Sequence, residues 1–361
     1  MKRRATVAAL VLAVPSVFGA SAASAQVRVA AASSSITLDG AGANSIDPFF
    51  QKVFYDYHQT YPNVTINYSP AGSSVGISDI QQNTVAFGDT EIPMAAKDLA
   101  KAKGTVLQVP VDLGGVAISY NVPGAPKNLK LAPSTLAGIF EGTITNWDSP
   151  LIAAVTGVNN LPNLRIVPVH RADSSGPGWD LDDYLIKNSS SWVAKIGTST
   201  ASKTWPLAKV GVGEQLNSGV ATYIAQTAGA IGFVEYGYAL EAGFSNAALL
   251  NRSNAFVAPS ASAIALAGIS ATNLSASNFD IVDGPGSGTY PLANFSWTLL
   301  YQKQANTAVG VSLQRLFTYV ITAGQLQAAK LGYAPLPMSV VALAKSTLAQ
   351  LENSAGKPLS G

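Results

Sequence analysis

Short strand patterns alternate with helical patterns along most of the chain. Residues 35–44 (SITLDGAGAN) indicate a strand that enters a glycine turn, and residues 63–69 (NVTINYS) alternate apolar and polar side chains as a second strand does. Between them, one helix face is marked by apolar residues at helical spacing, namely Phe50, Val53, Phe54 and Tyr57. Another helix is expected from Ile77 and Ile80, just after a glycine and serine turn.

The same order of strand, polar turn and helix returns in residues 164–186 (LRIVPVHRADSSGPGWDLDDYLI). The strand pattern runs to Val169, and one helical face follows the turn, formed by Leu181, Tyr184 and Leu185. Repeated alternation of this kind favours an α/β architecture with mainly parallel sheets.

Near the C-terminus, apolar residues at helical spacing predict a further helix, and they are Leu313, Leu316, Phe317 and Val320. Gly324 follows them, so we expect that glycine to close the helix. Residues 249–290 are instead rich in Ser, Ala, Asn and Gly. We interpret this stretch as a variable excursion.

Three polar turns made of small residues stand between a strand pattern and a helix pattern: residues 40–45 (GAGANS), 71–76 (AGSSVG) and 171–178 (RADSSGPG). Helix N-termini carry unpaired N–H donors and a positive dipole end, so several such turns meeting in a cleft bind an oxyanion. Arg171 in the third turn can add a planar, bidentate grip. Ser, Asn and Asp also favour ordinary helix caps, but three turns with an arginine beside an aspartate favour an oxyanion site.

Residues 72–76 (GSSVG) also fit the G-x-S-x-G pattern of a nucleophilic serine, which would be Ser74. A secreted serine hydrolase is therefore an alternative function. It needs a histidine base downstream, and His170 is the only candidate there. Arg171 beside that histidine disfavours the imidazolium that a catalytic triad must form, so we prefer a binding role for this turn.

The N-terminus has the features of an export signal. Three basic residues precede an apolar run over residues 5–18, and residues 23–25 (ASA) match the preference of signal peptidase. The run is shorter than the roughly 20 residues of a membrane anchor. We therefore expect residues 1–25 to be a cleaved signal peptide, residues 26–37 to be a linker, and the mature protein to be periplasmic or secreted.

Charge and cysteine content exclude several classes of function. Without the three basic residues of the signal, the 22 Lys and Arg become 19 against 20 Asp and Glu. No basic face for nucleic acid is indicated. The absence of cysteine excludes disulfides, thiolate metal sites and a lipid-anchored N-terminal cysteine. The two histidines, His58 and His170, lie too far apart in the sequence for a recognisable metal motif, so no metal and no cofactor is expected.

Seven segments of the chain resemble, in order and approximate spacing, the PstS family of phosphate-binding proteins of ABC importers. They are LDGAGANSIDPFFQKVFYDY, YSPAGSSVGISDIQQNTVAFGDTEIPM, VPVDLGGVAISYNVPG, LAGIFEGTITNWDSPLI, VPVHRADSSGPGWDLDDYL, GVATYIAQTAGAIGFVEYGYAL and LGYAPLP. The resemblance implies a two-lobe periplasmic-binding-protein-like α/β fold with a ligand cleft between lobes. Lobe I would comprise residues 38–120 plus 292–361, and lobe II residues 121–291.

The resemblance also implies a function. The chain would be an exported, monomeric, non-enzymatic protein that binds inorganic phosphate and delivers it to the membrane permease of an ABC importer. By position, the implied ligand-binding residues are Asn44, Ser45, Ser73, Glu91, Arg171, Asp173, Ser175 and Gly176, with Asp173 orienting the arginine.

Three positions depart from the family pattern. Asn44 and Pro177 stand where threonines are usual, and Glu91 stands where an aspartate is usual. A buried carboxylate rejects sulfate but accepts a proton from phosphate. Asp89, two residues earlier, is the alternative acceptor, and either residue could instead be a solvated loop carboxylate. A protein retuned to a different oxyanion is therefore a further alternative.

Overall fold

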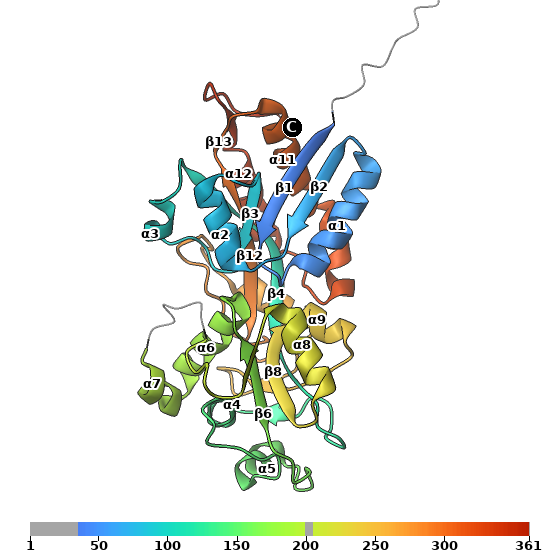
Figure 1. Ribbon diagram of the computed structural model, residues 1–361, viewed down its shortest axis with the longest axis vertical. Helices are drawn as coiled ribbons and strands as arrows, with labels where there is room; N and C mark the ends of the chain where they lie inside the picture. Colours follow the sequence, from blue (N-terminus) through green and yellow to red (C-terminus); the bar gives the residue numbers. More distant parts are fainter. Residues whose placement is uncertain (1–34, 199–204, 361) are drawn as a thin grey trace, which may run out of the picture. The chain divides into compact units, whose positions relative to one another are not determined.

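The computed structural model describes residues 35–198 and 205–360, so the expected signal peptide lies outside the described residues. Figure 1 shows a first group of parallel strands covered by helices. The strands are β1 (Ile36–Gly42), β2 (Val64–Ser69) and β3 (Phe87–Thr90). The helices are α1 (Asp47–Thr60), α2 (Ser73–Gln82), α3 (Ala96–Leu99), α11 (Thr307–Val320), α12 (Met338–Leu348) and the 3₁₀ helix η1 (Ala323–Leu331).

A second group of strands lies at the other end of the same sheet. Its parallel strands are β6 (Val167–Arg171), β7 (Val212–Glu214) and β8 (Ala230–Glu235). The helices that follow or flank them are α4 (Pro133–Phe140), α5 (Pro150–Thr156), α6 (Gly176–Asn188), α7 (Ser190–Ile196), α8 (Leu216–Gln226), α9 (Tyr236–Glu241) and α10 (Ala261–Ser270).

Two long strands join the groups: β4 (Val106–Tyr120) and β12 (Ala293–Tyr301). The two strands are antiparallel to each other. On its other edge β12 pairs with β3, and the C-terminal part of β4 pairs with β8; both of these pairings are also antiparallel. The strand order is therefore β2-β1-β3-β12-β4-β8-β6-β7. Short strands complete the fold, namely β5 (Lys130–Leu131), β9 (Ser245–Asn246), β10 (Ala248–Leu250), β11 (Phe256–Val257), β13 (Lys303–Gln304) and β14 (Glu352–Asn353).

Most predicted elements are confirmed, and the differences have simple causes. The sheet is mixed, because the two joining strands are antiparallel to their neighbours. The helix predicted around Leu313 and Val320 is α11, which ends at Val320 with Ile321 as its C-cap, so the prediction that Gly324 closes it was wrong. That glycine lies in η1, against the side chain of Val53. Strand β1 already begins at Ile36, within the last residues assigned to the linker.

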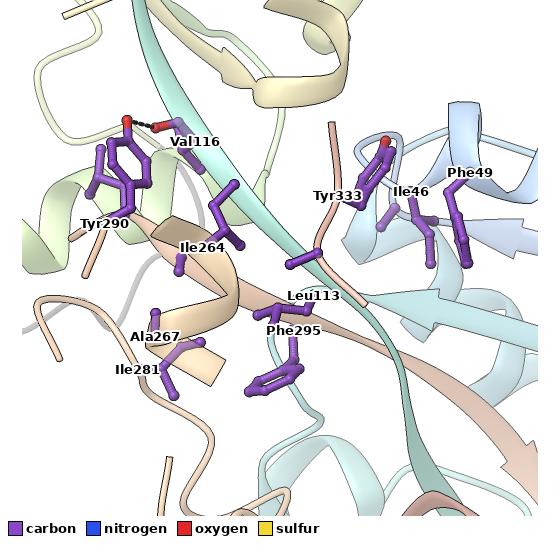
Figure 2. Packing of buried hydrophobic residues seen from close by; sticks show 14 of the residues in the cluster. Ile46, Phe49, Leu113, Val116, Ile264, Ala267, Ile281, Tyr290, Phe295 and Tyr333 are labelled. Carbon is purple, nitrogen blue, oxygen red and sulfur yellow. Dashed lines mark hydrogen bonds between the residues drawn. The ribbon is translucent and has the colours of Figure 1, made fainter. Parts of the chain in front are cut away.

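The joining strands are held by a continuous apolar core. Figure 2 shows Leu113 of β4 and Phe295 of β12 near Ile264 of α10, and all three are buried. The Tyr290 hydroxyl donates a hydrogen bond of 2.7 Å to the carbonyl of Val116. Burial of a Leu, Ile or Phe side chain contributes roughly 1.5 to 3 kcal/mol, so this packing fixes the strands beside which the polar turns meet. Within the described ranges, no helix is both long and apolar enough to cross a membrane.

Candidate functional site

The three polar turns predicted from the sequence are joined by hydrogen bonds. The first and second are linked by the Gly72 N–H, which donates to the Gly42 carbonyl at 2.7 Å. The second and third are linked by the Ser74 hydroxyl, which donates to Ser174 Oγ at 2.8 Å. Since each turn follows the carboxyl end of a parallel strand and begins a helix, several helix N-termini lie close together.

Arg171 ends strand β6 and is only 1% exposed. Its Nε donates to Asp173 Oδ1 at 2.7 Å, and its Nη2 donates to Asp173 Oδ2. Burial favours a raised pKa for Asp173, but the Arg171 hydrogen bond and charge, with the Leu216 N–H, hold the pKa below its ordinary value. The aspartate is therefore ionised at neutral pH, and it holds the guanidinium in one orientation.

Glu91 follows strand β3 and is 4% exposed. Its Oε2 accepts a hydrogen bond of 3.1 Å from the Gly176 N–H, at the first residue of α6. A Cβ atom at Gly176 would lie 2.4 Å from this carboxyl group, so the contact requires a glycine. Burial raises the pKa of Glu91, while Ser45, Arg171 and Gly176 partly oppose that rise. Glu91 therefore occupies the N–H donor of the first residue of α6.

Asp89 is fully buried but faces a different element. Its Oδ2 accepts a hydrogen bond of 3.2 Å from the Thr298 hydroxyl on β12. Burial, together with the charges of Glu91 and Asp112, raises its pKa well above the ordinary value. The geometry therefore places Glu91, and not Asp89, against the N-terminus of α6, and neither is a solvated loop residue.

Asn44 uses both ends of its amide on distant residues. Its Nδ2 donates to the Tyr238 hydroxyl at 2.9 Å, and its Oδ1 accepts from the Asn217 N–H at 2.8 Å. The Tyr238 hydroxyl in turn donates to the Asn44 carbonyl at 3.0 Å. The sequence reasoning missed Tyr238 and Asn217, although Tyr238 lies in one of the seven segments that carry the family resemblance.

The three candidate serines occupy the turns but differ in their bonding. Ser73 begins α2, and its Oγ accepts from the Glu91 N–H at 3.4 Å. Ser175 caps α6, since its Oγ accepts from the Gly178 N–H at 3.1 Å. Ser45 is buried beside Glu91, and its hydroxyl opposes the rise in the pKa of that carboxyl group.

A groove opens beside these turns. Its volume is about 1190 Å³, and Ser74 and Ser174 line it together with Ile92, Trp179 and Phe279. Ser74, Ser174 and Ile92 are direct neighbours in sequence of candidate site residues. The groove therefore lies next to the second and third turns, although the candidate site residues themselves do not line it.

The hydrolase alternative receives no support from the contacts of Ser74. Its hydroxyl is bonded to Ser174, whereas His170 contacts the Arg171 carbonyl through Nδ1 at 3.1 Å and stacks on Trp205. Within the described ranges, no group of three or more His, Cys, Asp or Glu residues is arranged to hold a metal ion.

The chain matches a family model described as PBP superfamily domain over residues 27–323. It is 36% identical over 311 residues to the phosphate-binding protein PstS of Xylella fastidiosa, an alignment that covers 85% of this chain and 83% of that protein. It is 33% identical over 308 residues to PstS of Pasteurella multocida, with 84% and 88% covered.

Solved structures agree on the fold. One is a high-affinity periplasmic phosphate-binding protein bound with phosphate, with a TM-score of 0.68 at 20% identity and 86% and 93% of the two chains covered. Another is a phosphate-binding protein from Stenotrophomonas maltophilia, with a TM-score of 0.68 at 16% identity and 87% and 94% covered.

Two α/β groups joined by β4 and β12, with polar turns meeting beside them, define a two-lobe solute-binding protein. The α/β fold class predicted from the sequence is thereby confirmed. At the finer level, the chain belongs to the PstS family of phosphate-binding proteins.

Proposed function

We propose that this protein is exported, binds inorganic phosphate in the cleft between its lobes, and delivers it to the permease of an ABC importer. The relatives are named phosphate-binding proteins, which favours a binding function without catalysis, cofactor or metal. The proposal includes a cleaved signal over residues 1–25, a periplasmic or secreted location, and action as a monomer.

The observation that carries the proposal is the buried Arg171, fixed by Asp173 and located in the turn that leads into α6. A fixed guanidinium next to helix N-termini supplies charge and directed donors to a tetrahedral oxyanion. The proposed ligand contacts come from Asn44, Ser45, Ser73, Glu91, Arg171, Ser175 and Gly176, with Asp173 orienting the arginine. The lobes would be residues 38–120 plus 292–361, and residues 121–291, so that β4 and β12 act as the hinge.

Phosphate is expected to raise the melting temperature of the purified mature protein. A ligand at 100 times its dissociation constant stabilises the folded state by about 2.7 kcal/mol if it binds only that state. Thermal unfolding with phosphate, sulfate and molybdate measures this directly. A shift with sulfate or molybdate but none with phosphate would favour the retuned oxyanion protein, and ester hydrolysis that is lost in Ser74→Ala would favour the hydrolase.

Tyr238→Phe is expected to weaken phosphate binding without unfolding the protein. The hydroxyl makes two hydrogen bonds with Asn44 across the proposed cleft, and a neutral hydrogen bond contributes about 0.5 to 1.5 kcal/mol. We expect a loss of affinity of about tenfold, measured by calorimetry. Tyr236→Phe on the same helix is the matched control, because it removes a hydroxyl that faces no such contact with Asn44. Equal affinities of both variants and the wild type would show that the hydrogen bonds between Tyr238 and Asn44 do not contribute to phosphate binding.

A further inference from the structure

Five buried carboxyl groups surround the inner edge of the proposed site. They are Asp89, Glu91, Asp112, Asp180 and Glu235, each at most 4% exposed. They come from the end of β3, from β4, from α6 and from β8. Both strand groups therefore contribute buried carboxyl groups near the joining strands β4 and β12. These groups lie beside the proposed hydrogen-bond donors to phosphate.

Asn294 of β12 links members of this acid cluster. Its Nδ2 donates to Asp180 Oδ2 and, at 3.5 Å, to Glu91 Oε1. A Cβ atom on Gly114 would lie 2.3 Å from Glu235 Oε1 and 3.2 Å from Asn294 Oδ1. Glu235 and Asn294 thus crowd the same glycine, so Glu91, Asp180 and Glu235 gather around Asn294, and Asp89 and Asp112 act on this group through their charges.

The acid cluster has too few hydrogen-bond donors. Asp89 Oδ1, Asp112 Oδ1 and Glu235 Oε2 are buried and have no hydrogen-bond partner within the described ranges. Arg171, the cation that faces the cluster, is already paired with Asp173. Buried acceptors without donors are costly, so the cluster favours any ligand that brings hydrogen-bond donors and little negative charge.

Glu91 is faced by titratable groups from every neighbouring element. They are Asp89, Asp112, Asp180, Glu235, Arg171, Asp173 and Tyr68. Further out, Asp183 and Asp280 face Asp180, and Tyr238 and Tyr333 face Glu235. Acidic groups therefore outnumber basic ones among these neighbours of Glu91.

Burial, reinforced by mutual repulsion, raises the pKa of all five acids, and Asp89, Asp112, Asp180 and Glu235 lie well above their ordinary values. These directions agree with the shortage of donors, because a protonated carboxyl group is neutral and can itself donate. Because the raised pKa values mean that negative charge is already unfavourable here, a second negative charge on the ligand is opposed.

Building on the proposed function, we propose that the site takes phosphate as the singly charged dihydrogen form and discriminates against the doubly charged hydrogen form. Dihydrogen phosphate carries two O–H donors and one charge, whereas hydrogen phosphate carries one donor and two charges. The first donor serves Glu91, and the second serves the acid cluster behind it. Selection thus acts between protonation states of one molecule.

Calorimetry with inorganic phosphate from pH 5.5 to 8.5 tests this selection. If the dihydrogen form alone binds, the apparent dissociation constant rises about tenfold per pH unit above the second ionisation of phosphate, and binding at pH 8 takes up about one proton per phosphate. Proton uptake is measured on the wild type by repeating the titration in buffers of different ionisation enthalpy. A dissociation constant that is flat or falls with pH, or binding without proton uptake, overturns the inference.

Asp112→Asn provides the matched variant, since the amide keeps the size of the side chain, always offers a donor and cannot carry a negative charge. We expect it to strengthen binding at pH 8 by about tenfold and to change binding at pH 5.5 by less than threefold, whereas the exposed control Asp148→Asn changes neither. Equal effects of Asp112→Asn and Asp148→Asn on phosphate binding contradict the inference.

A folded wild-type protein that binds no phosphate at any pH instead overturns the proposed function. Failure of the inference and failure of the proposed function therefore give different results.

Discussion

Arg171→Ala is expected to weaken phosphate binding by about 100-fold to 10,000-fold. Hydrogen bonds to charged groups contribute about 1.5 to 3 kcal/mol each, and a guanidinium offers two directed donors to an oxyanion. Losing both corresponds to about 3 to 6 kcal/mol, and every 1.4 kcal/mol is a factor of ten in the dissociation constant. Ser175→Ala removes one neutral donor, so it should cost about 0.5 to 1.5 kcal/mol of binding. Calorimetry on variants whose circular dichroism matches the wild type measures both losses.

Removing the arginine alone also leaves Asp173 without its partner. The double variant Arg171→Ala with Asp173→Asn removes that uncompensated charge and isolates the loss of the guanidinium. Arg171→Lys keeps the charge but lacks the planar fork, so its affinity should fall between those of the wild type and Arg171→Ala. Equal losses in Arg171→Ala and Ser175→Ala would show that the arginine lies outside the ligand contacts.

The sequence predicted the local structure around the polar turns well. Small polar residues before an apolar helix face are a strong local signal, and the turns at Ser73 and Ser175 do begin α2 and α6. The pairing of Arg171 with Asp173 spans only two positions, so it too could be anticipated from nearby residues. Within the site, short sequence separation made these predictions possible.

Contacts between distant residues could not be predicted in the same way. Asn44 meets Tyr238 across 194 positions, and Glu91 meets Gly176 across 85. Periodicity reports which face of an element is apolar but not which elements become neighbours. The mixed sheet was missed for the same reason, because the antiparallel pairing of β4 with β12 joins strands that are far apart in the chain.

The acid cluster illustrates a further limit. Asp112 and Asp180 stand in segments whose neighbours read as an ordinary strand and an ordinary helix. Charged residues are seldom fully buried, so a sequence reading places them at the surface. Glu235 is buried in the same region because Gly114 and Gly115 leave room for its carboxyl group beside β4.

Glu91→Gln is expected to relax the discrimination between phosphate and sulfate. In the wild type, Glu91 Oε2 lies on the Gly176 N–H, where an ionised carboxylate opposes an anion that has no proton to donate. Two like charges about 4 Å apart repel by about 4 kcal/mol at an effective dielectric of about 20. Relief of even half that repulsion strengthens sulfate binding by roughly thirtyfold, because the amide can accept from Gly176 and donate to the anion at once.

Sulfate competition against labelled phosphate measures this change, and Asp89→Asn is the matched control. Asp89 is also a buried carboxylic acid, yet it contacts Thr298 on β12 and not the N-terminus of α6. Its amide variant should therefore leave sulfate discrimination within about threefold of the wild type, since any remaining effect acts through the more distant charge alone. Relaxed discrimination in Asp89→Asn with unchanged discrimination in Glu91→Gln would assign the role of proton acceptor to Asp89.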